Sequence, residues 1–145
     1  MTLELLIKRL DTGLTLPRKA HEHDAGLDLI SAIDISLKPG ERILIPTGIA
    51  VAIPTGHAGY VQPRSGLAIT RGLGIVNSPG LIDSGYRGEI SVIAINLDQD
   101  EAIDINRGEK IAQLVVLPVP EIRVVEADSL PDSQRGTGGF GSTGA

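Results

Sequence analysis

Cysteine is absent from this 145-residue chain, so neither a disulfide framework nor a thiolate metal site can form. Tryptophan is absent too, and the aromatic side chains are Tyr60, Tyr86 and Phe140, which leaves the core to aliphatic residues. No apolar run approaches the roughly 20 residues that a membrane-spanning helix needs, and the charged start of the chain does not resemble a signal peptide. We therefore expect a soluble, cytoplasmic protein with an aliphatic core.

A surplus of basic residues is also missing. The chain has 13 Lys and Arg against 18 Asp and Glu, a formal net charge of -5. An extended basic face for nucleic acid is therefore not expected, because neutralising a phosphate backbone requires clustered cations. A small anionic ligand held by a few local arginines remains compatible with this balance.

Long helical periodicity is lacking, and 18 glycines and 9 prolines separate short aliphatic runs. Such runs, bounded by turn residues, are typical of strands in a sandwich or barrel. One short helix is predicted where Ser65 is an N-cap candidate, Arg71 falls in the last turn and Gly72 suits the left-handed C-terminal position. The predicted fold is all-β with one helix, and the predicted strands are residues 3–7, 43–45, 49–53, 90–95, 111–117 and 122–125.

The chain divides into two parts of different character. Residues 1–130 have the length and apolar content of one packed domain. Residues 131–145 are rich in glycine and contain almost nothing that packs, which predicts a flexible tail.

Two short segments before residue 70 carry candidate polar groups. Asp28 lies between apolar residues at the start of a predicted strand, where a solvated strand-edge aspartate is the simpler interpretation. Arg64, Ser65 and Gly66 stand at the predicted helix start, where free N–H groups, a forked cation and close backbone approach suit a phosphate. Ordinary capping by Ser65 is the alternative, and it leaves Arg64 and Gly66 unexplained.

A third segment, residues 72–90, has two turn signals around the apolar pair Leu81 and Ile82, which predicts a hairpin that presents Asp83. Fixed backbone N–H and C=O groups in such a hairpin match the edge of uracil, and tight packing excludes the methyl group of thymine. The alternatives are a turn-forming role for Asp83 and a core position for Tyr86.

The last two segments are Gln113, inside an apolar run, and the tail. A buried amide without partners is costly, so Gln113 contacts a ligand, a water, a neighbouring subunit or the core, and a satisfied core amide is the simpler interpretation. The tail places Arg135 and Phe140 among glycines and hydroxyls, which suits a lid in which arginine meets a phosphate and phenylalanine stacks on a base. A disordered terminus is the alternative.

These five segments, in this order, resemble the five motifs of the homotrimeric dUTPase family, and the resemblance runs from Ala25 to Gly144. It implies a distorted β-barrel of jelly-roll type, three subunits and three active sites, each built from all three chains. It also implies hydrolysis of dUTP to dUMP and pyrophosphate, which limits uracil in DNA and supplies dUMP for dTMP synthesis.

The resemblance also assigns roles to individual residues. It implies that Asp83 is the general base, that Tyr86 lies under the deoxyribose, and that Asp28 orients waters of a substrate-bound Mg²⁺. The remaining substrate contacts that it implies are Asn77, Leu81 and Ile82 for uracil, Arg64, Ser65, Gly66 and Gln113 for phosphates, and Arg135, Phe140, Gly141 and Ser142 for the lid.

Two other functions compete. A dCTP deaminase is similar in fold, but it is expected to carry a glutamate where this chain has Ile93. A non-enzymatic jelly-roll subunit would not need Asp83, Tyr86 and Arg135 together.

Overall fold

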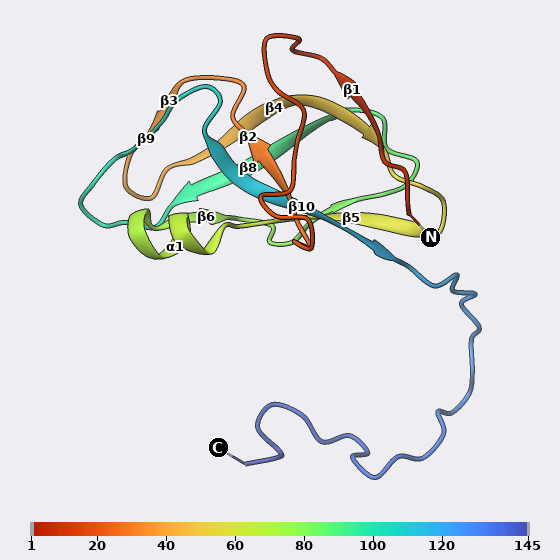
Figure 1. Cartoon of the computed structure of the whole chain (residues 1–145). Coiled ribbons are helices and arrows are strands. Elements are labelled where there is room, and N and C mark those ends of the chain that lie inside the picture. The colour runs from red at the N-terminus through yellow and green to blue at the C-terminus, as the bar shows by residue number, and fades with distance from the viewer. Residues whose placement is uncertain (1, 145) are drawn as a thin grey trace.

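The computed structural model describes residues 2–144. One helix and ten strands follow one another along the chain (Figure 1). They are β1 Leu6–Arg9, β2 Leu27–Ile30, β3 Ile35–Leu37, β4 Arg42–Ala52, β5 His57–Gln62, α1 Ser65–Arg71, β6 Leu73–Ile75, β7 Gly80–Ile82, β8 Glu89–Asn96, β9 Ile103–Ile105 and β10 Lys110–Pro118. No helix among the described residues is long and apolar enough to cross a membrane.

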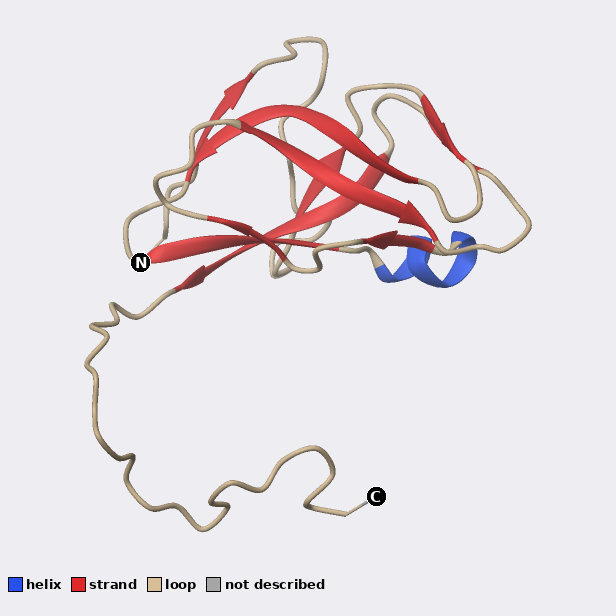
Figure 2. Cartoon of the chain, turned by 180° about the vertical axis from the view of Figure 1, so that it is seen from behind, coloured by secondary structure: helices blue, strands red, loops and turns tan. Residues whose placement is uncertain are grey.

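The strands form two four-stranded sheets and one small pair. The order is β1-β4-β8-β6 in the first sheet and β2-β10-β5-β7 in the second, and β3 pairs with β9. All of these pairs are antiparallel. The two larger sheets lie one above the other, with α1 at one end (Figure 2).

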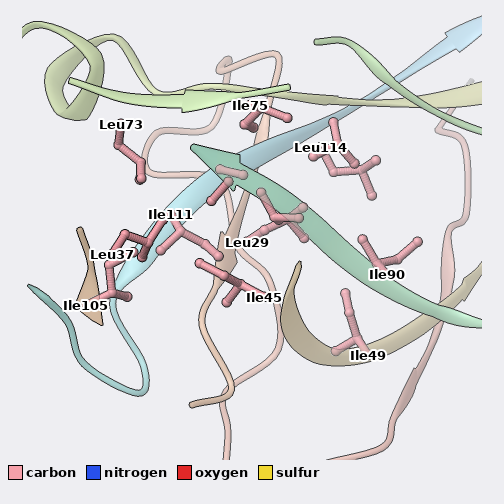
Figure 3. Packing of buried hydrophobic residues seen from close by; sticks show 14 of the residues in the cluster. Leu29, Leu37, Ile45, Ile49, Leu73, Ile75, Ile90, Ile105, Ile111 and Leu114 are labelled. Atoms are coloured by element: carbon pink, nitrogen blue, oxygen red, sulfur yellow. The ribbon is translucent and has the colours of Figure 1, made fainter. Parts of the chain in front are cut away.

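The residue pattern of β8 shows why the sheets pack in this way. Its side chains alternate strictly between buried and half-buried positions, so one face of the strand turns inward. Leu29, Ile45 and Ile90 are completely buried between the sheets (Figure 3). No aromatic residue is among the buried hydrophobic side chains of the described chain, as the composition predicted.

Strand β4 covers two segments that were predicted from the sequence as separate strands. The predicted runs 43–45 and 49–53 are one strand whose pairing with β8 shifts between Pro46 and Ala50. Gly48 lies at this shift with a φ of 73°, a value that glycine adopts without a steric penalty. The turn residues thus bend a strand here and do not end it.

Helix α1 starts differently from the prediction. The N-cap residue is Arg64, with an extended backbone and no side-chain cap, so Ser65 as N-cap was wrong. Its other end is confirmed: Arg71 is in the last turn and Gly72 has a φ of 68°. The Ser65 hydroxyl is thus not used to cap the helix.

The segment from β6 to β7 is not a two-stranded hairpin, which corrects the prediction for residues 72–90. Strand β6 pairs with β8, whereas β7 pairs with β5 in the other sheet. The apolar pair Leu81 and Ile82 therefore lies at the edge of the second sheet, and the turns around it cross between sheets.

The last strand of the barrel, β10, ends at Pro118. The predicted strand 122–125 was wrong, since no strand forms there and Ile122 and Val124 are 77% and 91% exposed. Beyond β10 the chain runs away from the barrel (Figure 1), so it has no neighbouring strand within this chain to pair with.

Candidate functional site

The predicted phosphate residues share one cavity. Asp28, Arg64, Ser65, Gly66 and Gln113 all line a pocket of about 320 Å³. Asp28 and Gln113 are directly paired residues on β2 and β10, and the chain reaches Arg64 two residues after the end of β5. Residues that are far apart in sequence are thus brought together by the second sheet.

Ion pairs hold Asp28 in this pocket. Its Oδ1 lies 3.5 Å from Arg64 Nε, and its buried Oδ2 lies 2.6 Å from Lys110 Nζ, a charge contact in which Oδ2 accepts no hydrogen bond. The Asp28 side chain is only 15% exposed, so the simpler interpretation, a solvated strand-edge aspartate, was wrong. Lys110 was not predicted as a site residue, because nothing in the local sequence pattern shows that its side chain lies beside Asp28.

Gln113 combines the two interpretations that the sequence left open. Its Nε2 donates a hydrogen bond to the carbonyl of Pro63 at 2.9 Å, which gives the amide nitrogen a partner. Its side chain also lines the phosphate pocket. Gly26 leaves room for it, since a Cβ on this glycine would lie 2.6 Å from Gln113 Oε1.

A second cavity, of about 330 Å³, holds the predicted base and sugar residues. Leu81, Ile82, Asp83 and Tyr86 line it, together with Ile93 on β8. The aliphatic Ile93 therefore stands beside the candidate base, where a deaminase is expected to carry a glutamate. The other acid of this cavity, Glu89, accepts a hydrogen bond from the Gly48 N–H at 2.9 Å.

Asp83 is exposed and free. Within residues 2–144 its carboxylate takes part in no hydrogen bond or ion pair, so it does not form the expected side-chain turn. The turn after it is held by other groups: Asp83 O accepts from the Tyr86 N–H at 3.0 Å, and Arg87 donates to the carbonyls of Ser84 and Tyr86 at 2.7 and 2.9 Å. The backbone is thus fixed while the carboxylate remains available to a ligand.

Tyr86 is not a core residue, since 44% of it is exposed. Its hydroxyl donates to the Glu89 carbonyl at 3.0 Å. A Cβ on Gly88 would lie 2.4 Å from the Tyr86 hydroxyl oxygen, so only glycine permits this ring position. The ring is therefore held flat against the chain beside Asp83.

Asn77 and the tail lie outside both cavities. Asn77 is exposed, and its amide lies over Gly80, where an added Cβ would come within 3.3 Å of Asn77 Nδ2. In the tail, Arg135 Nε bonds the Gly138 carbonyl at 2.9 Å, and Phe140 is fully exposed with a φ of 51°. Gly141 and Ser142 follow in the same tight turns. The tail residues are therefore not brought to either cavity of their own chain.

The two cavities lie toward opposite edges of the second sheet, whose edge strands are β2 and β7. Asp28 and Gln113 alternate with Leu29 and Leu114, which are buried, so they lie on the outer face of the second sheet. Leu44 and Ile93 are paired outward residues of the first sheet. Asp83 and the phosphate residues thus line two separate cavities of this chain.

A metal cage is not found among residues 2–144, where no three His, Cys, Asp or Glu side chains gather. The phosphate pocket holds two carboxylates, Asp24 and Asp28, and one cation, Arg64. This donor set suits a hydrated Mg²⁺ that arrives with an anionic ligand, because such an ion keeps most of its waters.

Comparison with known proteins decides the family. The family model described as dUTPase matches residues 13–144. The chain belongs to the dUTPase family. A deoxyuridine 5'-triphosphate nucleotidohydrolase of Rhodococcus erythropolis is 54% identical over 142 residues, which cover 98% of this chain and 87% of that protein. The protein of the same name in Thermobifida fusca is 53% identical, over 99% of this chain and 80% of its own.

Solved structures agree with the family assignment. A point mutant of the Staphylococcus bacteriophage 80alpha dUTPase, with dUpNHpp, superposes with a TM-score of 0.92 at 30% identity, covering 99% of this chain and 100% of its own. A variant dUTPase of the S. aureus phage phi11, described as coordinating a structural Mg(II) ion, has a TM-score of 0.83 at 28% identity, over 90% of this chain and 100% of its own. The predicted distorted jelly-roll β-barrel with one short helix is confirmed.

Proposed function

We propose that the protein hydrolyses dUTP to dUMP and pyrophosphate, as a homotrimer with an active site between its chains. The observation that carries the shared site is that the phosphate residues and Asp83 line two separate cavities toward opposite edges of the second sheet of one chain. Family membership and the dUpNHpp bound to a relative support the nucleotide as substrate.

The apolar outer face of the first sheet supports assembly. Leu44 and Leu97 are 63% and 65% exposed there, and the outward side chains Ile93 and Ile95 lie between them on β8. A sheet that is apolar on both faces requires a partner for the second face.

The placement of the cavities favours a ring. A two-fold dimer would have to bring both edges of each chain into one contact, whereas a head-to-tail contact joins one edge of each chain to the other edge of the next. Three chains form such a closed ring, and the tail, which leaves its own barrel, is then free to reach a site formed by the other two chains.

In the shared site, uracil lies against Asn77, Leu81 and Ile82, and the deoxyribose lies on Tyr86. The fixed ring of Tyr86 leaves no room for a 2′-hydroxyl and so disfavours UTP. On the neighbouring chain Arg64, Ser65, Gly66 and Gln113 hold the phosphates. The tail closes over them: Arg135 meets the γ-phosphate, Phe140 stacks on the base, and Gly141 and Ser142 add backbone and hydroxyl contacts.

The reaction begins with a water beside Asp83. The carboxylate accepts a proton as the water oxygen bonds to the α-phosphorus, and the bond from this phosphorus to the α,β-bridging oxygen breaks with that oxygen leaving in pyrophosphate. Because the Asp83 carboxylate has no protein partner in the described chain, it is free to take this proton.

Mg²⁺ enters as part of the substrate, coordinated by the triphosphate. When bound, the ion would supply charge stabilisation for the leaving pyrophosphate. Asp28, with Asp24 the second carboxylate of the phosphate pocket, would hold it through water.

An assay with dUTP and Mg²⁺ that follows pyrophosphate tests the proposal, with UTP, dCTP and dTTP as comparison substrates. We expect hydrolysis of dUTP alone, and no ammonia from dCTP, since Ile93 has no acid to supply. Absence of turnover would reject the proposed activity and favour a non-enzymatic, structural role. Sedimentation equilibrium tests the trimer.

A further inference from the structure

Lys110 has no role in the proposed reaction, yet its side chain makes the shortest ion pair with Asp28, at 2.6 Å. We propose that Lys110 is a positioning residue that acts through Asp28 to hold Arg64 ready for the phosphates. The inference rests on the proposed function, since it assigns Arg64 to the triphosphate.

A β-bulge places Lys110 on this face of the sheet. In β10 the register shifts between Lys110, which pairs with Ile30, and Ala112, which pairs with Leu29. The extra residue, Ile111, turns into the core with Ala112. Without the bulge, strict alternation would put Lys110 on the inner face. The bulge thus aims Lys110 at Asp28, a use that is common beside active sites.

Arg64 is fixed at two of its nitrogens. Nε lies 3.5 Å from Asp28 Oδ1, and Nη1 donates to the backbone carbonyl of Lys110 at 3.4 Å. Both contacts depend on β2 and β10, so the guanidinium is oriented before a ligand arrives. Its remaining donors are left for the pocket that it lines.

The charge of Lys110 explains why this arrangement needs a second cation. Asp24, Asp28 and Arg64 line the phosphate pocket and together carry a formal charge of -1, although the pocket must take an anion. Lys110 approaches the Asp28 carboxylate from an adjoining cavity and offsets part of its negative charge. The positive charge of Arg64 is then less neutralised by Asp28 and attracts a phosphate more strongly. Without Lys110, Arg64 would be the only cation near the largely buried Asp28 carboxylate. The guanidinium would then move toward Asp28 and away from the phosphate pocket.

The first experiment compares Lys110→Met with Lys110→Arg and with Lys19→Met. Lys19 lines the same adjoining cavity as Lys110, has no ion pair within the described chain, and matches the loss of charge. We expect Lys110→Met to raise the KM for dUTP and the dissociation constant for dUpNHpp about tenfold, the scale of losing an outer partner of a binding residue, while kcat changes little. Lys110→Arg restores both values, and Lys19→Met leaves them near the wild type. A Lys110→Met protein that binds like the wild type overturns the inference, as does an equal loss in Lys19→Met.

The second experiment does not depend on activity. Nitrogen NMR follows the Arg64 Nε–H resonance, assigned by its disappearance in Arg64→Lys, and we expect Lys110→Met but not Lys19→Met to shift it. An unchanged resonance overturns the positioning role even if the wild type proves inactive, whereas a wild type without turnover contradicts the proposed function alone. Thermal unfolding controls for the fold, and because Lys110 is 48% exposed the melting temperature should change little.

Discussion

The two halves of the proposed site are built in opposite ways. In the phosphate pocket every charged group of the central cluster is paired, since Asp28 contacts both Arg64 and Lys110. In the base and sugar pocket the backbone is tied down by Arg87 and Tyr86, but Asp83 has no side-chain partner in the described chain. A group that binds a permanently charged ligand gains from being held in place, whereas a general base must keep its lone pairs free.

The largest expected effect comes from removing the free carboxylate. Asp83→Asn keeps the shape of the side chain, so we expect dUpNHpp binding and thermal stability to persist while kcat falls by about 10²–10⁴-fold, the usual contribution of a general base. Asp104→Asn is the control, because Asp104 is an exposed aspartate on β9, outside both pockets. Near-normal kcat in Asp83→Asn would reject Asp83 as the base.

Truncation after Leu130 tests whether the two pockets need the C-terminal tail for activity. The tail has little apolar surface and Phe140 is fully exposed, so we expect the trimer and its melting temperature to be retained. If the tail closes the site, kcat/KM falls about 10²-fold, the scale of a loss of substrate positioning. Full activity of the truncated protein would show that the tail is an ordinary disordered terminus.

A methyl group at Gly88 disturbs only the sugar side. A Cβ there would lie 2.6 Å from Tyr86 Cζ, so Gly88→Ala must displace the ring. We expect about a tenfold loss of preference for dUTP over UTP, read from the ratio of their kcat/KM values, because a pocket that excludes a group by shape gives discrimination of this order. Gly85→Ala is the matched control, since a Cβ on Gly85 meets nothing within 4 Å. Equal ratios in the two variants would show that the position of the Tyr86 ring does not determine the preference for deoxyribose over ribose.

The smallest effect concerns a pairing outside both pockets. Arg107 contacts both carboxylate oxygens of Asp11 and lowers the pKa of Asp11, mainly through the hydrogen bond, and the bond from the Gly13 N–H adds to this. Because the folded pKa lies below the ordinary value of 3.8, the pair stabilises the fold fully above that pH and loses its effect as the pH falls through the folded pKa. We expect Asp11→Asn to lower the melting temperature slightly at neutral pH and not at all at low pH, with activity unchanged. A constant difference across the pH series would contradict the linkage.

Much of this molecule was predictable from sequence because the signals are local. The aliphatic strands, the single helix and its end at Gly72 follow from residue type and spacing, as does the exposed tail. The errors arose where a pattern has more than one solution. Residues 122–125 have strand composition but no neighbour within the chain, and Gly48 bends a strand where a break was expected.

The sequence by itself determined the family, the residue types of the site and the absence of any thiol chemistry. Only the tertiary structure decided which of these residues meet. Pairing of β2 with β10 puts Gln113 opposite Asp28, and a bulge adds Lys110 to the same face, contacts that depend on register and not on spacing along the chain. The strand order of the second sheet then separates the phosphate pocket from Asp83, because Asp28 lies on β2 at one edge and Asp83 follows β7 at the other edge.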